Sequence, residues 1–327
     1  MKKRINILIL AVAAMMAVGC EKVVEFDMGD IEPKVVVNSL VQMDSTISMK
    51  LTYSRFFLEG GYGNNTFRVI DNAAITLLRN GMPESVTGGV DGIYTSSCKP
   101  QPGDTLSLVV SVPGHEEITS GCRIPRKADF DVVDFEVDTN GRWGDIRCRL
   151  RLKINDVAGE RNFYRISALG WDSYWDSISP RDRMKITFEC SDPVFGDATN
   201  IETVIDGGDN TRYGQELDFA DTYFEGSSHV LTITFSIYDY MYYDYGIHSV
   251  LPSEWPVELF VTSISEELYR YSQTRNASDE DMLGLFSEPV QVYSNIKGGV
   301  GIFAAQTTDK CKLIPRYSTF ANNRYEK

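Results

Sequence analysis

The chain has 327 residues, with 46 acidic and 32 basic side chains and a formal net charge of −14. A surface this acidic repels nucleic acid and anionic lipid. Binding to DNA or RNA is therefore not expected. A chain of this length can bury a sizeable core, and two domains are the natural expectation.

The first twenty residues follow the order of residue types that bacterial secretion requires. Residues 2–4 are basic. Residues 5–18 are apolar except for Asn6, and this stretch is shorter than the ~20 residues that a membrane-spanning helix needs. The stretch ends in small residues directly before Cys20. This resembles the bacterial lipobox, in which the cysteine thiol is acylated and the signal is cut in front of it. An ordinary signal peptide followed by a structural cysteine is the alternative.

We therefore predict that residues 1–19 are a cleaved signal peptide and that Cys20 carries the membrane anchor. Each buried methylene of an acyl chain adds about 0.8 kcal/mol to membrane binding, so a multiply acylated cysteine is a lasting anchor. Removing the three positive charges of residues 2–4 takes the formal charge from −14 to −17. Residues 20–32 are short and acidic and predict a lipidated tether.

Residues 33–126 have the pattern of an antiparallel β-sandwich. Short alternating stretches are separated by turn signals about every 8–12 residues, with no helical period between them. One turn is Asn80-Gly81, a dipeptide that tight hairpins prefer. The predicted strands are residues 34–41, 46–53, 73–79, 92–97, 105–112 and 117–124.

Residues 127–327 predict a second β-rich domain, because the strand pattern is interrupted at residues 125–127. One short helix is expected at Glu266–Asn276, since Ser265 is a good N-cap and the first turn is acidic. The fold class is therefore mainly β. The predicted strands of this part are residues 131–137, 146–155, 162–171, 184–190, 229–240, 257–263 and 302–306.

Two long polar segments are expected to be loops, which often carry binding residues on a β scaffold. Residues 59–65 are rich in glycine and asparagine and contain Tyr62. Residues 206–221 contain several aspartates, and calcium prefers clustered carboxylates. Their spacing departs from the EF-hand pattern, so a solvated acidic loop is the favoured interpretation.

A run of tyrosines at residues 238–245 is the most prominent aromatic feature. Its alternation fits an ordinary strand with one aromatic face, which is the favoured interpretation. The alternative is a ligand site, because exposed tyrosines stack on sugar faces or form protein interfaces. The candidate ligand-binding residues are Tyr242 and Tyr243, together with Tyr62.

Cys98 and Cys122 fall at the ends of neighbouring predicted strands and are a candidate disulfide, which requires Cα atoms within about 7 Å. Buried free thiols are an alternative with at least equal support. Five cysteines follow Cys20, so they cannot all pair within the chain, and none has the CxxC spacing of a zinc or redox site.

Motifs for independent catalysis are missing from the sequence. The three histidines lack HExxH spacing, and no GxSxG elbow, P-loop or dinucleotide fingerprint opens a helix. We therefore expect a non-enzymatic protein with no catalytic residues, no metal and no cofactor. Carboxylates are abundant enough for a glycosidase pair, so a surface hydrolase is the least favoured alternative.

Six segments carry a distinctive combination of motifs, namely residues 32–38, 92–94, 102–105, 113–115, 265–271 and 293–303. Together they resemble a family of Bacteroidota outer-membrane lipoproteins known only as a domain of unknown function. The last segment, YSNIKGGVGIF, is the most specific. The resemblance implies an N-terminal transthyretin-like or Ig-like sandwich and a role beside TonB-dependent receptors. It carries over no catalytic residue.

The expected function is a non-enzymatic accessory or substrate-capture partner of a TonB-dependent nutrient uptake system. The resemblance implies such a receptor as partner, and the lipid anchor implies the membrane. Acidic residues soon after Cys20 suit surface-directed lipoproteins, so we expect the protein on the outer membrane, at the cell surface, with its periplasmic face as the alternative. The alternative is a stand-alone surface module that binds a glycan or peptide.

Overall fold

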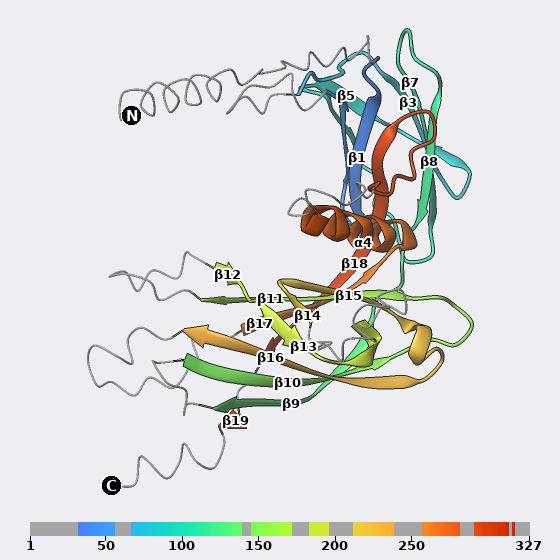
Figure 1. Cartoon of the computed structure of the whole chain (residues 1–327). Helices are drawn as coiled ribbons and strands as arrows, with labels where there is room; N and C mark the ends of the chain where they lie inside the picture. Colours follow the sequence, from blue (N-terminus) through green and yellow to red (C-terminus); the bar gives the residue numbers. More distant parts are fainter. Residues whose placement is uncertain are drawn as a thin grey trace, which may run out of the picture. The chain divides into compact units, whose positions relative to one another are not determined.

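The described part of the chain consists of three β-sheets and one α-helix (Figure 1). The computed structural model describes residues 32–55, 67–138, 145–171, 183–195, 212–238, 257–281, 291–313 and 316–317. Residues 34–327 form one compact unit. The expectation of a mainly β chain is confirmed. No helix within the described ranges has the length and apolarity needed to cross a membrane.

The largest sheet has nine strands and draws them from both halves of the chain. In spatial order its strands are β12 (Arg183–Lys185), β11 (Phe163–Trp171), β17 (Val257–Ile264), β18 (Val300–Leu313), β1 (Val35–Gln42), β2 (Ile47–Tyr53), β6 (Ile93–Ser96) and β5 (Thr87–Val90), with β15 (Glu216–Ala220) paired to β11.

Each of the two smaller sheets comes from one half of the chain. The four-stranded sheet has the order β4 (Met82–Glu84), β3 (Ala74–Arg79), β7 (Thr105–Ser111) and β8 (Ile118–Arg123). The six-stranded sheet has the order β14 (Arg212–Gly214), β13 (Phe188–Cys190), β16 (Ser228–Tyr238), β10 (Asp145–Asn155), β9 (Asp129–Asp138) and β19 (Arg316–Tyr317).

Two hydrophobic cores form where the smaller sheets pack on the large one. Val37 and Met49 of the large sheet share the first core with Leu106 of the four-stranded sheet. Val261 of the large sheet shares the second core with Leu150 of the six-stranded sheet. Each core lies between two packed sheets, which is the arrangement of a β-sandwich.

Strand β18 belongs to both sandwiches. Its first half, Val300–Gln306, pairs in parallel with β1, and its second half, Gln306–Leu313, pairs antiparallel with β17. Phe303 is buried in the first core, and Leu313 is buried in the second. One strand of fourteen residues therefore couples the two sandwiches.

The chain crosses from the first sandwich to the second at residues 125–127, beside β18. The Thr307 hydroxyl is fully buried and donates to the Pro125 carbonyl at 2.7 Å. Lys127 forms an ion pair with Asp309 at 3.0 Å. These contacts hold the crossing against the strand that both sandwiches share. The division of the chain into two domains at residue 126 stays a prediction.

We expect that residues 33–126, expressed alone, do not fold. The fragment lacks Ile296 and Phe303, which are buried in the first core, and it leaves the edge of β1 without the seven residue pairs that β18 supplies. Amide-proton dispersion in a two-dimensional NMR spectrum measures this. A well-dispersed spectrum with cooperative thermal unfolding would contradict the expectation, and the full chain is the folded control.

The segment before β18 is fixed by Asn295. Its side-chain amide accepts from the Phe303 N–H at 3.0 Å and donates to the Phe303 carbonyl at 2.7 Å and to the Gly121 carbonyl at 3.2 Å. The Ser120 hydroxyl donates to the Asn295 carbonyl at 3.1 Å. Asn295 therefore ties β8 of the small sheet to β18 of the large one.

The six strands predicted for residues 33–126 are confirmed, each within one residue at either end. Asn80 and Gly81 both have positive φ, at 51° and 81°, as the predicted tight hairpin requires. The sequence did not indicate β4 and β5. β5 is short and contains Gly88, where an added Cβ would meet the Ile93 carbonyl oxygen at 2.4 Å.

Two predictions for the second half are corrected. The single strand predicted at residues 184–190 is wrong, because β12 and β13 belong to different sheets. Between them the Ile186 N–H donates to the Ala168 carbonyl, and a period-two pattern does not reveal such a change of sheet. The strand predicted at residues 302–306 is longer, since β18 continues through the polar residues 307–310.

The predicted helix is confirmed as α4 (Glu266–Asp281), which continues five residues beyond its expected end. It packs on the large sheet through Leu268, which shares a small cluster with Phe163 of β11, Ile264 of β17 and Ala304 of β18. The Ser265 hydroxyl, expected to cap the helix, accepts from the Ala305 N–H at 3.2 Å. The start of the helix is thereby tied to β18.

Candidate functional site

Four of the predicted site residues lie outside the described part of the chain: Cys20, Tyr62, Tyr242 and Tyr243. The tyrosine run is reached only at Tyr238, the last residue of β16. The lipidation site and the tyrosine ligand site therefore stay predictions.

Cys98 and Cys122 are both buried and are free thiols in the structure. Burial is the largest cause that raises the pKa of each thiol, and for Cys122 the negative charge of Glu267 adds to it. Both groups therefore stay protonated and unreactive at neutral pH. Their pairing as a disulfide stays a prediction.

The interpretation of residues 206–221 as a solvated acidic loop is wrong for the part that the structure describes. Glu216–Ala220 is strand β15, where Leu217 and Phe219 are buried in the second core. Asp221 is buried and accepts from the Asn162 N–H at 2.5 Å. Across the described ranges, no three His, Cys, Asp or Glu side chains are grouped so as to hold a metal ion.

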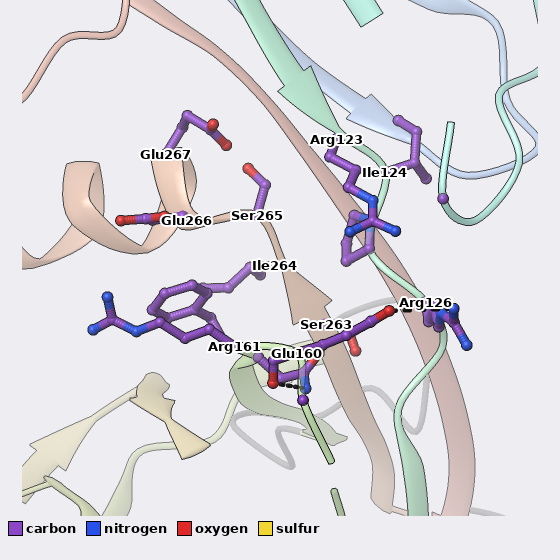
Figure 2. A pocket seen from close by; sticks show the side chains of 15 residues that line it. Arg123, Ile124, Arg126, Glu160, Arg161, Ser263, Ile264, Ser265, Glu266 and Glu267 are labelled. Carbon is purple, nitrogen blue, oxygen red and sulfur yellow. Dashed lines mark hydrogen bonds and ion pairs between the residues drawn. The ribbon is translucent and has the colours of Figure 1, made fainter. Parts of the chain in front are cut away.

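A pocket of about 320 Å³ lies where the two sandwiches meet (Figure 2). It is lined by the turn at Gly103, by the end of β8 and the crossing at residues 123–126, by residues 159–163 leading into β11, and by residues 263–267 between the end of β17 and the start of α4. Ligand pockets favour such junctions between folded units, and this volume is at the low end of their range of roughly 300–1,000 Å³.

Most charged groups around the pocket are already engaged. Arg126 pairs with Glu160 at 3.2 Å, and the Arg161 guanidinium lies 5.2 Å from the centre of the Phe163 ring. Glu266 lies 4.0 Å from Arg270, one helical turn further on. These side chains build the rim of the pocket.

Two charged groups at the pocket have no ion-pair or hydrogen-bond partner among the described residues. They are the Arg123 guanidinium, at the end of β8, and the Glu267 carboxylate, in the first turn of α4. Figure 2 shows them on opposite sides of the pocket. Within the described ranges, the pocket therefore offers one unpaired positive and one unpaired negative charge.

Ser263 adds a polar group to the lining of the pocket. The residue is only 6% exposed, yet its hydroxyl has no hydrogen-bond partner in the described ranges. A buried hydroxyl without a partner costs about 1–3 kcal/mol, so such groups are normally satisfied by protein, water or ligand.

The wall formed by α4 is held in place by Arg165 of β11. Its guanidinium makes two bonds to Asp218 of β15, at 2.6 and 2.7 Å, and one to the Ser272 hydroxyl of α4 at 2.7 Å. It also pairs with Glu216 at 3.0 Å. Burial opposes the charge on Arg165, but the bonds and charges of Asp218 and Glu216 outweigh it and raise its pKa.

We expect Arg165→Met to lower the free energy of unfolding by about 3–5 kcal/mol, because it leaves the Asp218 carboxylate, whose side chain is 6% exposed, without its cation. Urea unfolding followed by circular dichroism measures this loss. The control is Lys185→Met, which removes the more exposed pair with Glu216 and should cost at most about 1 kcal/mol. Equal losses in the two variants would contradict the assigned role.

Sequence reasoning missed this pocket. Its lining comes from four segments that are far apart in the chain, and none has a motif of its own. In the sequence, Glu266 and Glu267 are explained as acids that favour the start of a helix. Arg123 is explained as part of the end of a predicted strand. The interruption at residues 125–127 was the one signal that pointed to this region, since a ligand site is often found at a junction.

The comparison with known families covers both sandwiches and the pocket. A family described as Domain of unknown function (DUF4249) matches residues 21–312. The chain belongs to this family. The match begins directly after Cys20 and ends within β18, so it includes every segment that lines the pocket. None of the curated proteins matches the chain.

Proposed function

We propose that the protein is a non-enzymatic, lipid-anchored accessory protein of the Bacteroidota outer membrane, and that it captures substrate for a TonB-dependent receptor. The observation that carries the capture role is the junction pocket, where Arg123, Glu267 and Ser263 have no ion-pair or hydrogen-bond partner among the residues that the structure describes. The anchor rests on the lipobox-like residues before Cys20.

Two properties of the chain support a role beside a membrane partner. Its lipid anchor would confine the pocket to the membrane surface, which raises the local concentration of captured substrate near a receptor. Its acidic surface repels anionic lipid headgroups, so the anchor would provide the attachment while the folded part stays free of the membrane.

Co-purification tests the proposal. The full chain with an affinity tag is recovered from detergent-solubilised membranes, and bound proteins are identified by mass spectrometry. We expect a TonB-dependent receptor in the eluate and none with an equally tagged, unrelated lipoprotein. Recovery of the anchored protein without any such receptor would contradict the accessory role.

The junction pocket also suits the second candidate, a stand-alone surface module that binds a glycan or peptide. In that case the purified protein binds its ligand, and no receptor co-purifies. The two candidates therefore differ in the outcome of the same co-purification.

A further inference from the structure

The charges around the junction pocket restrict the chemistry of its ligand. Three arginines and three glutamates line it, and four of the six are engaged by other side chains. The remaining Arg123 and Glu267 have opposite charges and lie on opposite sides of the pocket (Figure 2). A neutral sugar would leave both charges unpaired on binding, and a simple anion would leave Glu267 unpaired.

We propose that this pocket binds a small zwitterion of the class of amino acids and short peptides, with its carboxylate on Arg123 and its ammonium group on Glu267. Arginine suits the carboxylate because its planar guanidinium donates two parallel hydrogen bonds. The volume of about 320 Å³ restricts the ligand to a small molecule.

Ser263 is an independent observation that points to a ligand. Ser263 lines the pocket, and its buried hydroxyl has no partner in the described part of the chain, so it is available to a peptide carbonyl or amide. Ile124 and Ile264 line the same pocket and give apolar contact to the small body between the two charged ends.

The test is calorimetric titration of the full chain in detergent with dialanine, N-acetyl-dialanine, dialanine amide and glucose. The assigned contacts are to the two charged ends, so methyl side chains suffice. We expect dialanine to bind at least tenfold more tightly than the acetylated peptide, which lacks the ammonium group, and than the amide, which lacks the carboxylate. Glucose should not bind.

Two variants assign the two ends. Arg123→Gln should abolish the preference for dialanine over its amide, and Glu267→Gln should abolish the preference over the acetylated peptide. Loss of folding would not reproduce this crossed pattern. The matched controls are Arg151→Gln and Glu116→Gln, which alter exposed charges away from the pocket and should leave all affinities unchanged.

Absence of dialanine binding at millimolar concentration, preferences that persist in both variants, or tighter binding of glucose would each overturn this assignment. The inference rests on the proposed function for its nutrient role, but the titration contains no receptor. A failed titration therefore contradicts the ligand class, whereas a failed co-purification contradicts the accessory role.

Discussion

Replacing Gly301 by alanine should destabilise the protein by about 3–5 kcal/mol, the combined cost of a strained backbone and an overpacked contact. Gly301 has a φ of 116°, a backbone angle that residues other than glycine rarely adopt. An added Cβ would lie 2.1 Å from the Val37 carbonyl oxygen on the paired strand β1. The backbone of β18 or β1 would have to move, and both belong to the first core.

Urea unfolding of Gly301→Ala beside Gly114→Ala separates the two causes. Gly114 also has a positive φ, 86°, but nothing lies within 4 Å of its added Cβ. We expect this control to lose only about 1 kcal/mol, the backbone cost alone. Similar losses in both variants would show that the close approach of β18 to β1 is not what Gly301 provides.

Replacing Cys20 by alanine should remove the protein from the membrane fraction and abolish its role in uptake, while the folded part keeps its thermal stability. The physical reason is the loss of acyl chains that contribute about 0.8 kcal/mol per buried methylene. Incorporation of a labelled fatty acid measures acylation, and membrane fractionation measures anchoring. Retained acylation or full uptake in the variant would contradict the assignment.

The matched control for the anchor is Cys311→Ala, which removes a half-buried thiol of β18 and should leave acylation and anchoring unchanged. Protease treatment of intact cells then measures surface display. We expect the wild-type chain to be degraded from outside, and full protection would place it on the periplasmic face.

The segment Tyr293–Phe303, the most specific part of the family resemblance, has a structural explanation. Asn295 bridges Gly121 and Phe303, and the following glycines allow close contact with neighbouring backbone. At Gly299 an added Cβ would lie 2.7 Å from the Val35 carbonyl oxygen. The motif therefore closes the first sandwich onto β18, and its residue types follow from folding rather than from ligand binding.

Local patterns predicted most of the first sandwich because its strands bury alternate residues and its turns contain glycine or proline. Leu106, Leu108 and Val110 of β7 show this alternation clearly. The patterns failed where tertiary contacts decide. Polar residues such as Thr307 conceal the strand pattern in the second half of β18. The side chain of Asp218, 6% exposed, is satisfied by Arg165 across the sheet.

The candidate site could not be predicted from the sequence, again because tertiary contacts decide it. Arg123 and Glu267 are 144 positions apart in the chain, and each has an ordinary local explanation. Only the packing of α4 against the junction brings them to one pocket. The role of such a residue depends on a second residue on the other side of the pocket, and no periodicity or spacing in the sequence reveals that role.

The central claim, a tethered protein that works beside an outer-membrane receptor, is tested most directly by photo-crosslinking in living cells. A crosslinking amino acid is placed at Arg126 on the pocket rim and, separately, at the exposed residues Val90, Met184 and Tyr213 of three sheet edges. We predict a covalent adduct with a TonB-dependent receptor from Arg126. Anchored, folded protein that gives no receptor adduct from any of the four positions would contradict the claim.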